Sequence, residues 1–165
     1  METLYIKKTT ELKRTKDELE KALKVKITIK ANQVTIDGEP VDEFEASNVI
    51  EAIGMGFSAK KALLLKDPDY TFRKINIKHF TRRKNLEDVR ARIIGKEGKT
   101  KKTMEDISGT YIVLDNNEVG LIGPTEEIDN ETTAMLNLIK GTKQANVYKF
   151  LEKLNTEKKK RQFFG

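Results

Sequence analysis

Two glycines three residues apart, Gly95 and Gly98, lie within a cluster of basic side chains. Glycine adopts backbone angles that a side chain forbids, and it lets another backbone approach closely. A tight turn that opens a helix also leaves N–H groups without partners in the helix, and these groups suit a phosphate. Six cations stand within a few residues of the pair: Arg90, Arg92, Lys96, Lys99, Lys101 and Lys102. The pattern predicts a site for the phosphate backbone of a nucleic acid.

The elements around this stretch set its context. The apolar pattern predicts a strand at 70–79, a helix that ends before Gly95, a helix that opens after Gly98, strands at 111–114 and 118–123, and a helix at 125–139. This order is that of a KH module, in which a GxxG loop clamps a nucleic-acid backbone. A bare GxxG also fits a plain helix–turn–helix connection, in which the glycines only turn the chain.

The first part of the chain resembles a diverged copy of the second. A shift of 85 residues aligns 25–29 with 110–114, and it aligns 31–38 with 116–123, where three residues are identical. The same shift places Gly95 and Gly98 on Thr10 and Lys13, so the first copy has no glycine there, and Glu11 would repel a phosphate. A chance alignment of two similar patterns is the alternative.

We predict an α+β fold with two tandem type I KH domains and a C-terminal helix. Each domain is expected to have the order βααββα, with a three-stranded sheet carrying helices on one face. The predicted divisions are a KH-like domain without the GxxG loop at 1–66, a KH domain with it at 67–142, and a C-terminal helix with a basic tail at 143–165. The tail is expected to contact RNA or to fray.

Charge is distributed unevenly along the 165 residues. Residues 1–70 hold 12 basic and 13 acidic side chains, whereas residues 71–165 hold 20 and 13, which gives net charges of −1 and +7. A polyanionic partner should therefore prefer the second part. The chain has no cysteine and no long apolar run, so we expect a cytoplasmic protein with no disulfide and no membrane span.

Nothing in the sequence predicts an enzyme. The single histidine, His79, has no partners at the spacing of a catalytic triad, and the acidic residues are dispersed among basic ones. We therefore expect no catalytic residue, no metal site and no cofactor.

Three phrases resemble the archaeal and eukaryotic partner-of-Nob family of two-KH-domain ribosome-assembly proteins. They are Ala52 to Phe57, Arg90 to Lys101, and the stretch from Gly141 through Asn146-Val147-Tyr148. The resemblance implies that the second KH domain binds single-stranded RNA near the 3′ end of small-subunit ribosomal RNA, and that the first lacks the loop. It also implies two protein partners, a Nob-type PIN endonuclease and the alpha subunit of initiation factor two.

The resemblance and the residue pattern together give a set of expected RNA-binding residues: Arg82, Arg83, Arg90, Ile94, Gly95, Lys96, Glu97, Gly98, Lys99, Lys101, Lys102 and Ile112. The glycines would clamp the backbone, the cations would contact phosphates, and Ile94 and Ile112 would lie under the bases. A core position is the alternative for either isoleucine. A competing function is a protein-interaction scaffold built on the first domain. An exosome cap subunit would need an additional β-barrel that the pattern does not predict.

Overall fold

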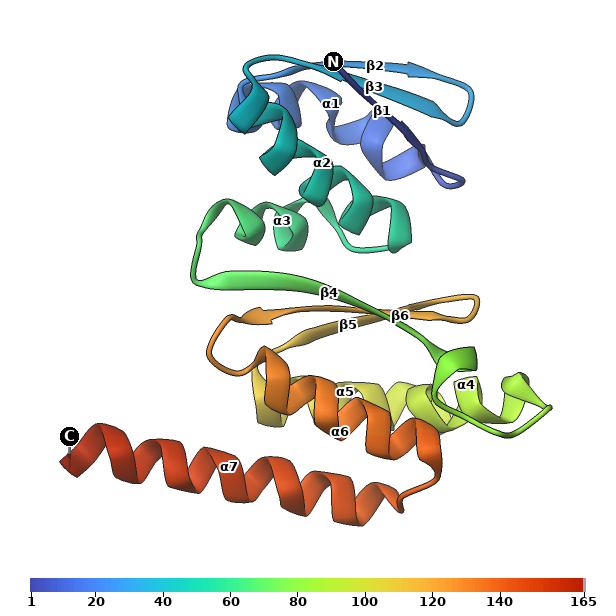
Figure 1. The fold of residues 1–165 in the computed structure, drawn as a ribbon, viewed down its shortest axis with the longest axis vertical. Helices are drawn as coiled ribbons and strands as arrows, with labels where there is room; N and C mark the ends of the chain where they lie inside the picture. Colours follow the sequence, from blue (N-terminus) through green and yellow to red (C-terminus); the bar gives the residue numbers. More distant parts are fainter. Residues whose placement is uncertain (165) are drawn as a thin grey trace. The chain divides into compact units, whose positions relative to one another are not determined.

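The computed structural model describes residues 1–164 and divides into two compact units, Met1–Phe72 and the chain from Arg73 onward. In each unit a three-stranded sheet has helices on one of its faces (Figure 1). This confirms the predicted α+β class with KH-type domains. The finer divisions after residues 66 and 142 remain a proposal, and residue 165 of the predicted tail lies outside the described residues.

The first unit has one helix between its first two strands. Its elements are β1 (Glu2–Tyr5), α1 (Thr10–Leu23), β2 (Lys26–Lys30), β3 (Gln33–Asp37), α2 (Pro40–Met55), α3 (Ala59–Ala62) and the 3₁₀ helix η1 (Leu63–Lys66). The sheet order is β1-β3-β2, and both pairs are antiparallel. Val34 and Ile36 of the central strand are fully buried, as are Leu12 and Leu19 of α1, and alternate residues of a strand face one side.

The ends of α2 and α3 follow local sequence signals. Pro40 stands at the first helical position of α2, where a missing N–H costs nothing. Gly56 ends α2 with φ at 125°, and its amide bonds to the carbonyls of Ala52 and Ile53. Two residues later, the Ser58 hydroxyl accepts a hydrogen bond from the Lys61 amide at 3.3 Å and so caps α3.

The second unit has the complete predicted order. Its sheet and helices are β4 (Tyr70–Asn76), which begins three residues before the division between the units, η2 (Ile77–His79), α4 (Leu86–Ile94), η3 (Lys96–Gly98), α5 (Lys99–Ser108), β5 (Tyr111–Asp115), β6 (Glu118–Pro124), α6 (Ile128–Lys140) and α7 (Gln144–Phe164). The sheet order is β4-β6-β5. A two-residue turn joins β5 and β6, in register from Tyr111↔Ile122 to Asp115↔Glu118, and Asn116 takes a φ of 53° there.

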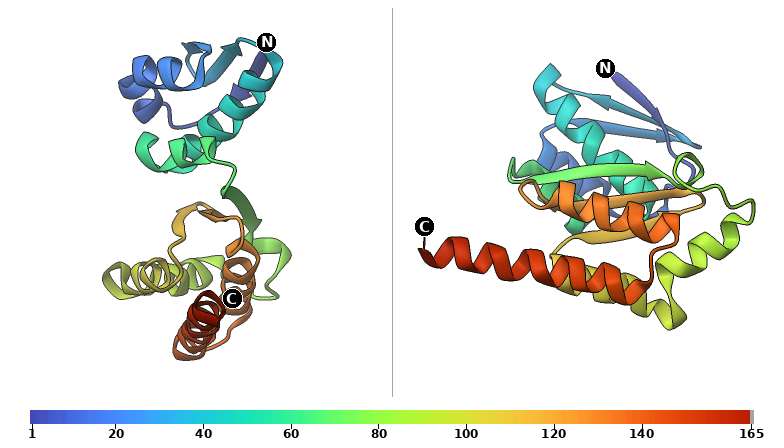
Figure 2. Two further views of the ribbon diagram at one scale, coloured as in Figure 1. Left: turned by 90° about the vertical axis from the view of Figure 1, so that its left-hand side faces the viewer. Right: turned by 60° about the horizontal axis from the view of Figure 1, so that its bottom comes forward.

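The predicted order βααββα is correct for the second unit and wrong for the first. Only residues 6–9 separate β1 from α1, which is too few for a helix and a GxxG turn. Thr10–Lys13, the segment aligned with the glycine loop, forms the first turn of α1. The later helix α3 packs against both α1 and α2, as α4 packs against both α5 and α6 (Figure 2). The helix α3, which follows the aligned segments in the sequence, thus takes the place in the first unit that α4 has in the second.

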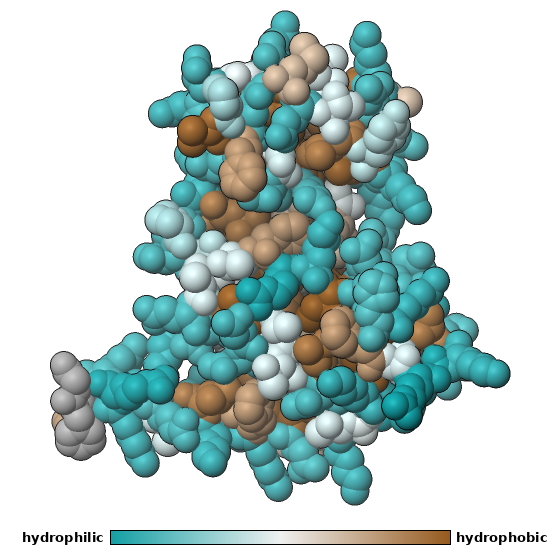
Figure 3. Space-filling model, in the orientation of Figure 1, coloured by the Kyte–Doolittle hydropathy of each residue, from teal (hydrophilic) through white to brown (hydrophobic). Residues whose placement is uncertain are grey.

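The predicted C-terminal helix is present as α7, which packs against α5 and α6 (Figure 2). Val147 and Leu151 of its apolar stripe are 2% and 4% exposed and extend the core of the second unit. Asn155 donates a hydrogen bond to the carbonyl of Ile107, which ties α7 to the end of α5. Most side chains on the face shown in Figure 3 are hydrophilic, and no helix among residues 1–164 has the length and apolarity to span a bilayer.

Candidate nucleic-acid-binding site

The glycine loop is a tight turn between two helices. Gly95 ends α4, and its amide donates to the Ala91 carbonyl at 2.8 Å. One 3₁₀ turn follows, closed by the Gly98 amide on the Gly95 carbonyl at 3.2 Å, and α5 begins at Lys99. Three residues have positive φ: Gly95 at 76°, Glu97 at 55° and Gly98 at 77°. The turn therefore depends on backbone angles that most side chains disfavour.

The two glycines have different roles. A Cβ placed on Gly95 would lie 2.1 Å from Oγ1 and 2.6 Å from the amide nitrogen of Thr100, so only glycine fits against this residue. A Cβ placed on Gly98 would meet nothing within 4 Å. Gly95 thus packs the turn against α5, whereas Gly98 faces open space. This is the side from which a ligand backbone can approach the loop.

The connection between α6 and α7 supports the loop. Gln144 donates from Nε2 to Thr100 Oγ1 at 3.3 Å and to the Arg92 carbonyl at 3.4 Å. Arg92 in turn donates to the Thr142 carbonyl at 2.6 Å, so this cation of the sequence cluster is occupied within the protein. Sequence analysis did not identify Gln144, because a lone glutamine at a helix start carries no signal that it contacts a residue 44 positions earlier.

Most cations of the loop are available to a ligand. Lys96, Lys99 and Lys102 are exposed, and no acidic side chain pairs with them among residues 1–164. Lys101 is half-buried and its ammonium pairs with Glu105 at 3.4 Å. Glu97 is also exposed and subtracts from the local positive potential. Three unpaired, exposed lysines therefore lie within four residues of Gly98.

The two isoleucines proposed as a floor for bases lie in different environments. Ile94, the last residue of α4, is 40% exposed beside the loop. Ile112 is 1% exposed and belongs to the core, and its amide donates to Glu105 Oε2 at 2.9 Å. The core alternative therefore describes Ile112, and Ile94 alone of the two presents an apolar surface to solvent.

The remaining predicted residues lie away from the loop. Arg90 donates to Asn117 Oδ1 at 2.6 Å and so connects α4 to the turn between β5 and β6. Arg82 and Arg83 precede α4, in the connection that follows η2. The nine residues of α4 span about 13 Å, so these two arginines stand at the opposite end of the helix from the glycines.

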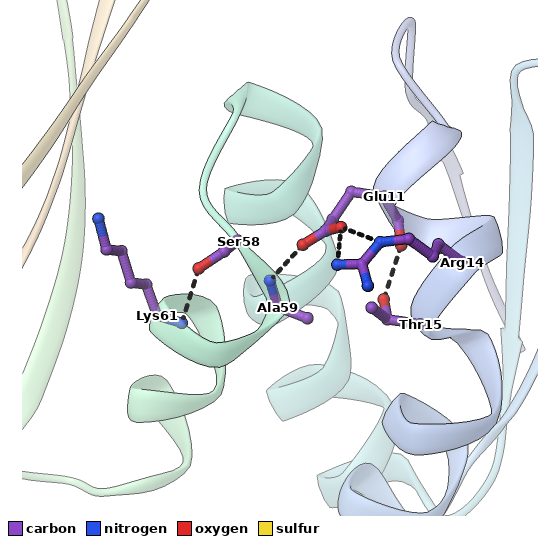
Figure 4. A network of polar contacts seen from close by, with 6 residues as sticks. All are labelled: Glu11, Arg14, Thr15, Ser58, Ala59 and Lys61. Carbon is purple, nitrogen blue, oxygen red and sulfur yellow. Dashed lines mark hydrogen bonds and ion pairs between the residues drawn. The ribbon is translucent and has the colours of Figure 1, made fainter.

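In the first unit, the segment that aligns with the glycine loop, Thr10–Lys13, makes contacts within its own unit. Glu11 accepts hydrogen bonds from the Ala59 amide at 3.0 Å and from Arg14 Nε at 2.9 Å (Figure 4). These bonds hold the pKa of the Glu11 carboxyl below its ordinary value, the Ala59 amide contributing most. A carboxylate therefore stands at the start of α3, and the first turn of α1 offers no free glycine backbone to a phosphate.

One buried acid lies in the core of the second unit. Glu131 on α6 is 1% exposed, and neither carboxylate oxygen has a hydrogen-bond partner in the described chain. Burial raises its pKa to about 7, and the charge of Glu105 adds to the rise. No group of three or more potential metal-ligating acids or histidines occurs among residues 1–164.

Comparison with known proteins places this geometry in context. A family model for the second KH domain of PNO1, described as a eukaryotic-type KH domain (KH-domain type I), matches residues 71–156. A KH domain-containing protein of Methanocaldococcus jannaschii is 32% identical over 155 residues, which are 90% of this chain and 68% of that protein. The RNA-binding protein pno-1 of Caenorhabditis elegans is 29% identical over 76% of this chain.

Solved structures show the same fold. Dim2p from Pyrococcus horikoshii superposes with a TM-score of 0.83 at 30% identity, covering 92% of this chain and 98% of that one. A second structure from that organism, a complex of a/eIF2alpha, aDim2p and rRNA, gives 0.84 at 29% identity and covers 94% of each chain. The chain spans about half the length of the nematode relative, at 49%.

Proposed function

Because the chain belongs to the PNO1/Dim2 family of KH-domain pre-rRNA-processing proteins, we propose that it binds single-stranded RNA near the 3′ end of small-subunit ribosomal RNA and assists its maturation. The Gly95–Gly98 loop is the contact. The observation that carries the proposal is the open side of Gly98, where nothing lies within 4 Å of an added Cβ, together with the three unpaired lysines within four residues of it.

The loop suits a flexible single strand. KH loops clamp the backbone of four nucleotides, so that the bases are splayed against an apolar surface. Here no side chain caps the start of the 3₁₀ turn or of α5, and Lys96 and Lys99 add charge at these two starts. Ile94 offers an exposed apolar surface where the clamp begins. The electrostatic part of the affinity comes from phosphates, and the apolar part comes from bases.

A paired substitution tests the loop without disturbing the fold. Glu97 has φ at 55°, and Asp is one of the residues that tolerate this region, so Lys96→Asp with Glu97→Asp preserves the turn. The expected result is loss of binding to a single-stranded oligomer from the ribosomal 3′ end. A matched control, Lys149→Asp with Glu152→Asp on an exposed face of α7, should bind as the wild type does.

The salt dependence of the affinity distinguishes phosphate binding by the loop from a general attraction between RNA and a basic protein. Each phosphate neutralised on a single strand should contribute about −0.7 to the slope of log affinity against log salt. The double loop variant should flatten this slope. If the affinity and the salt slope are unchanged in the variant, the loop does not bind the RNA. Crosslinking in cells, followed by sequencing, tests the target: reads spread evenly over messenger RNA would contradict a ribosomal role.

We further propose that the protein has no catalytic residue of its own and that a Nob-type PIN endonuclease cleaves the RNA that it positions. Support comes from the loop itself: the stretch from Ile94 to Lys102 contains one acid, Glu97, with no second carboxylate and no histidine. A preparation freed of other nucleases should bind the 3′-end RNA and leave it intact. Cleavage that persists after purification under denaturing conditions and refolding would overturn this.

A protein-binding role for the first unit is the second candidate, and two observations favour it. The first unit has no open glycine loop, and it exposes large apolar side chains on α2, with Val41 75% and Phe44 66% exposed. The similar P. horikoshii protein was solved with a/eIF2alpha as well as rRNA. We propose the initiation factor two alpha subunit and the Nob-type endonuclease as partners of this chain.

The two roles are separable in the full-length chain. After ribonuclease treatment, the Lys96→Asp/Glu97→Asp variant should still retain the protein partners in a pulldown. Val41→Asp with Phe44→Asp should lose them while binding RNA normally. Partners lost on ribonuclease treatment of the wild type would mean that RNA alone bridges them, which contradicts the scaffold role.

A further inference from the structure

A hollow in the second unit, separate from the glycine loop, gathers basic side chains around an exposed ring. Its volume is about 460 Å³, and it is lined by Phe80, Thr81, Arg82, Arg83 and Lys140. The first four belong to the connection between η2 and α4, and Lys140 is the last residue of α6. The lining includes three cations and no acid, so the hollow attracts an anion.

The three cations of the hollow lack partners within the described part of the chain. No carboxylate or other hydrogen-bond acceptor pairs with the side chains of Arg82, Arg83 or Lys140 in the described part of the chain. Two of the last four carbonyls of α6 are already satisfied, because the amides of Gly141 and Thr142 bond to Leu138 and Asn137 at 3.2 and 2.9 Å. Capping of these two carbonyls therefore does not account for this charge.

The ring is held in place at the rim of the hollow. Phe80 is 39% exposed, and its ring lies edge-on to the His79 imidazole, with centroids 6.4 Å apart. The Phe80 amide bonds to the Ile77 carbonyl at 3.1 Å, and the Arg83 amide bonds to Thr81 Oγ1 at 3.2 Å. An exposed aromatic ring beside unpaired cations suits a nucleobase with its phosphate, since bases stack on such rings.

We propose that this hollow binds one nucleotide of the same single-stranded RNA, outside the four that the glycine loop clamps. The base stacks on Phe80, and Arg83 and Lys140 contact its phosphate. This inference rests on the proposed function of the loop. The two sites stand at opposite ends of α4, about 13 Å apart along its axis, a separation that a few extended nucleotides bridge.

The connection between α6 and α7 links the two sites along α4. Arg83 lies against its first residue, since a Cβ added to Gly141 would be 3.5 Å from the Arg83 guanidinium. At the other end of the connection, Gln144 donates from Nε2 to Thr100 Oγ1 at 3.3 Å, and so contacts the residue against which Gly95 packs. A strand that leaves the loop beside α4 thus meets the hollow on the same unit.

The test compares RNA lengths on the full-length protein. Fluorescence anisotropy is measured with a four-nucleotide oligomer from the ribosomal 3′ end and with versions extended by several nucleotides at the 5′ or the 3′ side. We expect one extended version to bind more tightly than the short one, and Phe80→Ala to remove at least about fivefold of its affinity. The affinity for the short oligomer should not change in this variant.

Charge variants and a matched control complete the design. Arg83→Ala with Lys140→Ala should flatten the salt slope for the extended RNA by about 0.7 per lost phosphate contact. Lys149→Ala with Lys153→Ala, two exposed cations of α7, should leave the slope unchanged. Equal affinity of the wild type for short and extended RNA, or a Phe80→Ala effect on both lengths alike, would overturn the second site while the loop remains. A wild type that binds neither RNA would instead refute the proposed function.

Discussion

The same substitution, glycine to alanine, should have different consequences at the two glycines of the loop, Gly95 and Gly98. Gly95→Ala forces a residue at φ 76° and ψ 172°, a region that is essentially restricted to glycine and costs about 1–3 kcal/mol. Its Cβ would also lie 2.6 Å from the Thr100 backbone, which adds about 1–3 kcal/mol of overpacking. We expect a total destabilisation of the second unit of about 2–6 kcal/mol.

Gly98→Ala should cost much less. At φ 77° and ψ 12° the residue is left-handed helical, which costs an L-residue about 1–2 kcal/mol, and no atom lies within 4 Å of its Cβ. The unit should therefore stay folded. RNA affinity should nevertheless fall, because the new methyl group stands on the open side of the clamp.

Hydrogen exchange followed by NMR measures these costs within one molecule. Amides of Ile93 and Met104, both buried in the second unit, report its opening free energy. Amides of Val34 and Ile36 in the first unit serve as an internal control that neither variant should change. If Gly98→Ala destabilises the second unit as much as Gly95→Ala, the distinction between a packed and an open glycine is wrong.

Three further predictions concern single side chains. Because the folded state holds Glu131 neutral to about pH 7, against 4.5 when it is free, the second unit should lose up to about 3 kcal/mol as pH rises from 4.5 to 7. Glu131→Gln should abolish that loss in urea titrations at several pH values. Glu11→Gln should destabilise the first unit by about 1 kcal/mol at neutral pH, since the lowered pKa means that the charged form is stabilised, and this difference should vanish in acid. Gln144→Ala should accelerate amide exchange in the loop and weaken RNA binding about threefold, with the global melting temperature nearly unchanged.

The elements of the second unit were predictable because their signals are local. Glycine spacing, a two-residue asparagine turn and apolar periodicity each describe a few neighbouring residues. The topology of the first unit could not be predicted from the sequence. The segment that aligns with the second unit begins at α1, so it gives no indication that the helix before the glycine loop is absent from the first unit. The replacement by α3 depends on packing between residues about 50 positions apart, such as Glu11 and Ala59.

The sequence predicts which residue types surround the candidate loop, but not how they are arranged in space. Ile94 and Ile112 are both apolar residues beside turns or loops, and sequence alone does not show which one the sheet and helices enclose. Arg82 and Arg83 belong to the same basic stretch as the loop, yet the length of α4 separates them from it. Gln144 and Thr100 support the loop through a long-range contact, which no spacing rule reveals.

The central claim is that the glycine loop binds the RNA. Its most direct test is a titration of the 165-residue chain with a single-stranded 3′-end ribosomal oligomer, in which NMR monitors the chemical shifts of the backbone amides. The account predicts that the largest shifts fall on Ile94 through Lys99, and that Thr10–Lys13 of the first unit stay unchanged. Shifts concentrated on the first turn of α1, with none at the glycine loop, would contradict it.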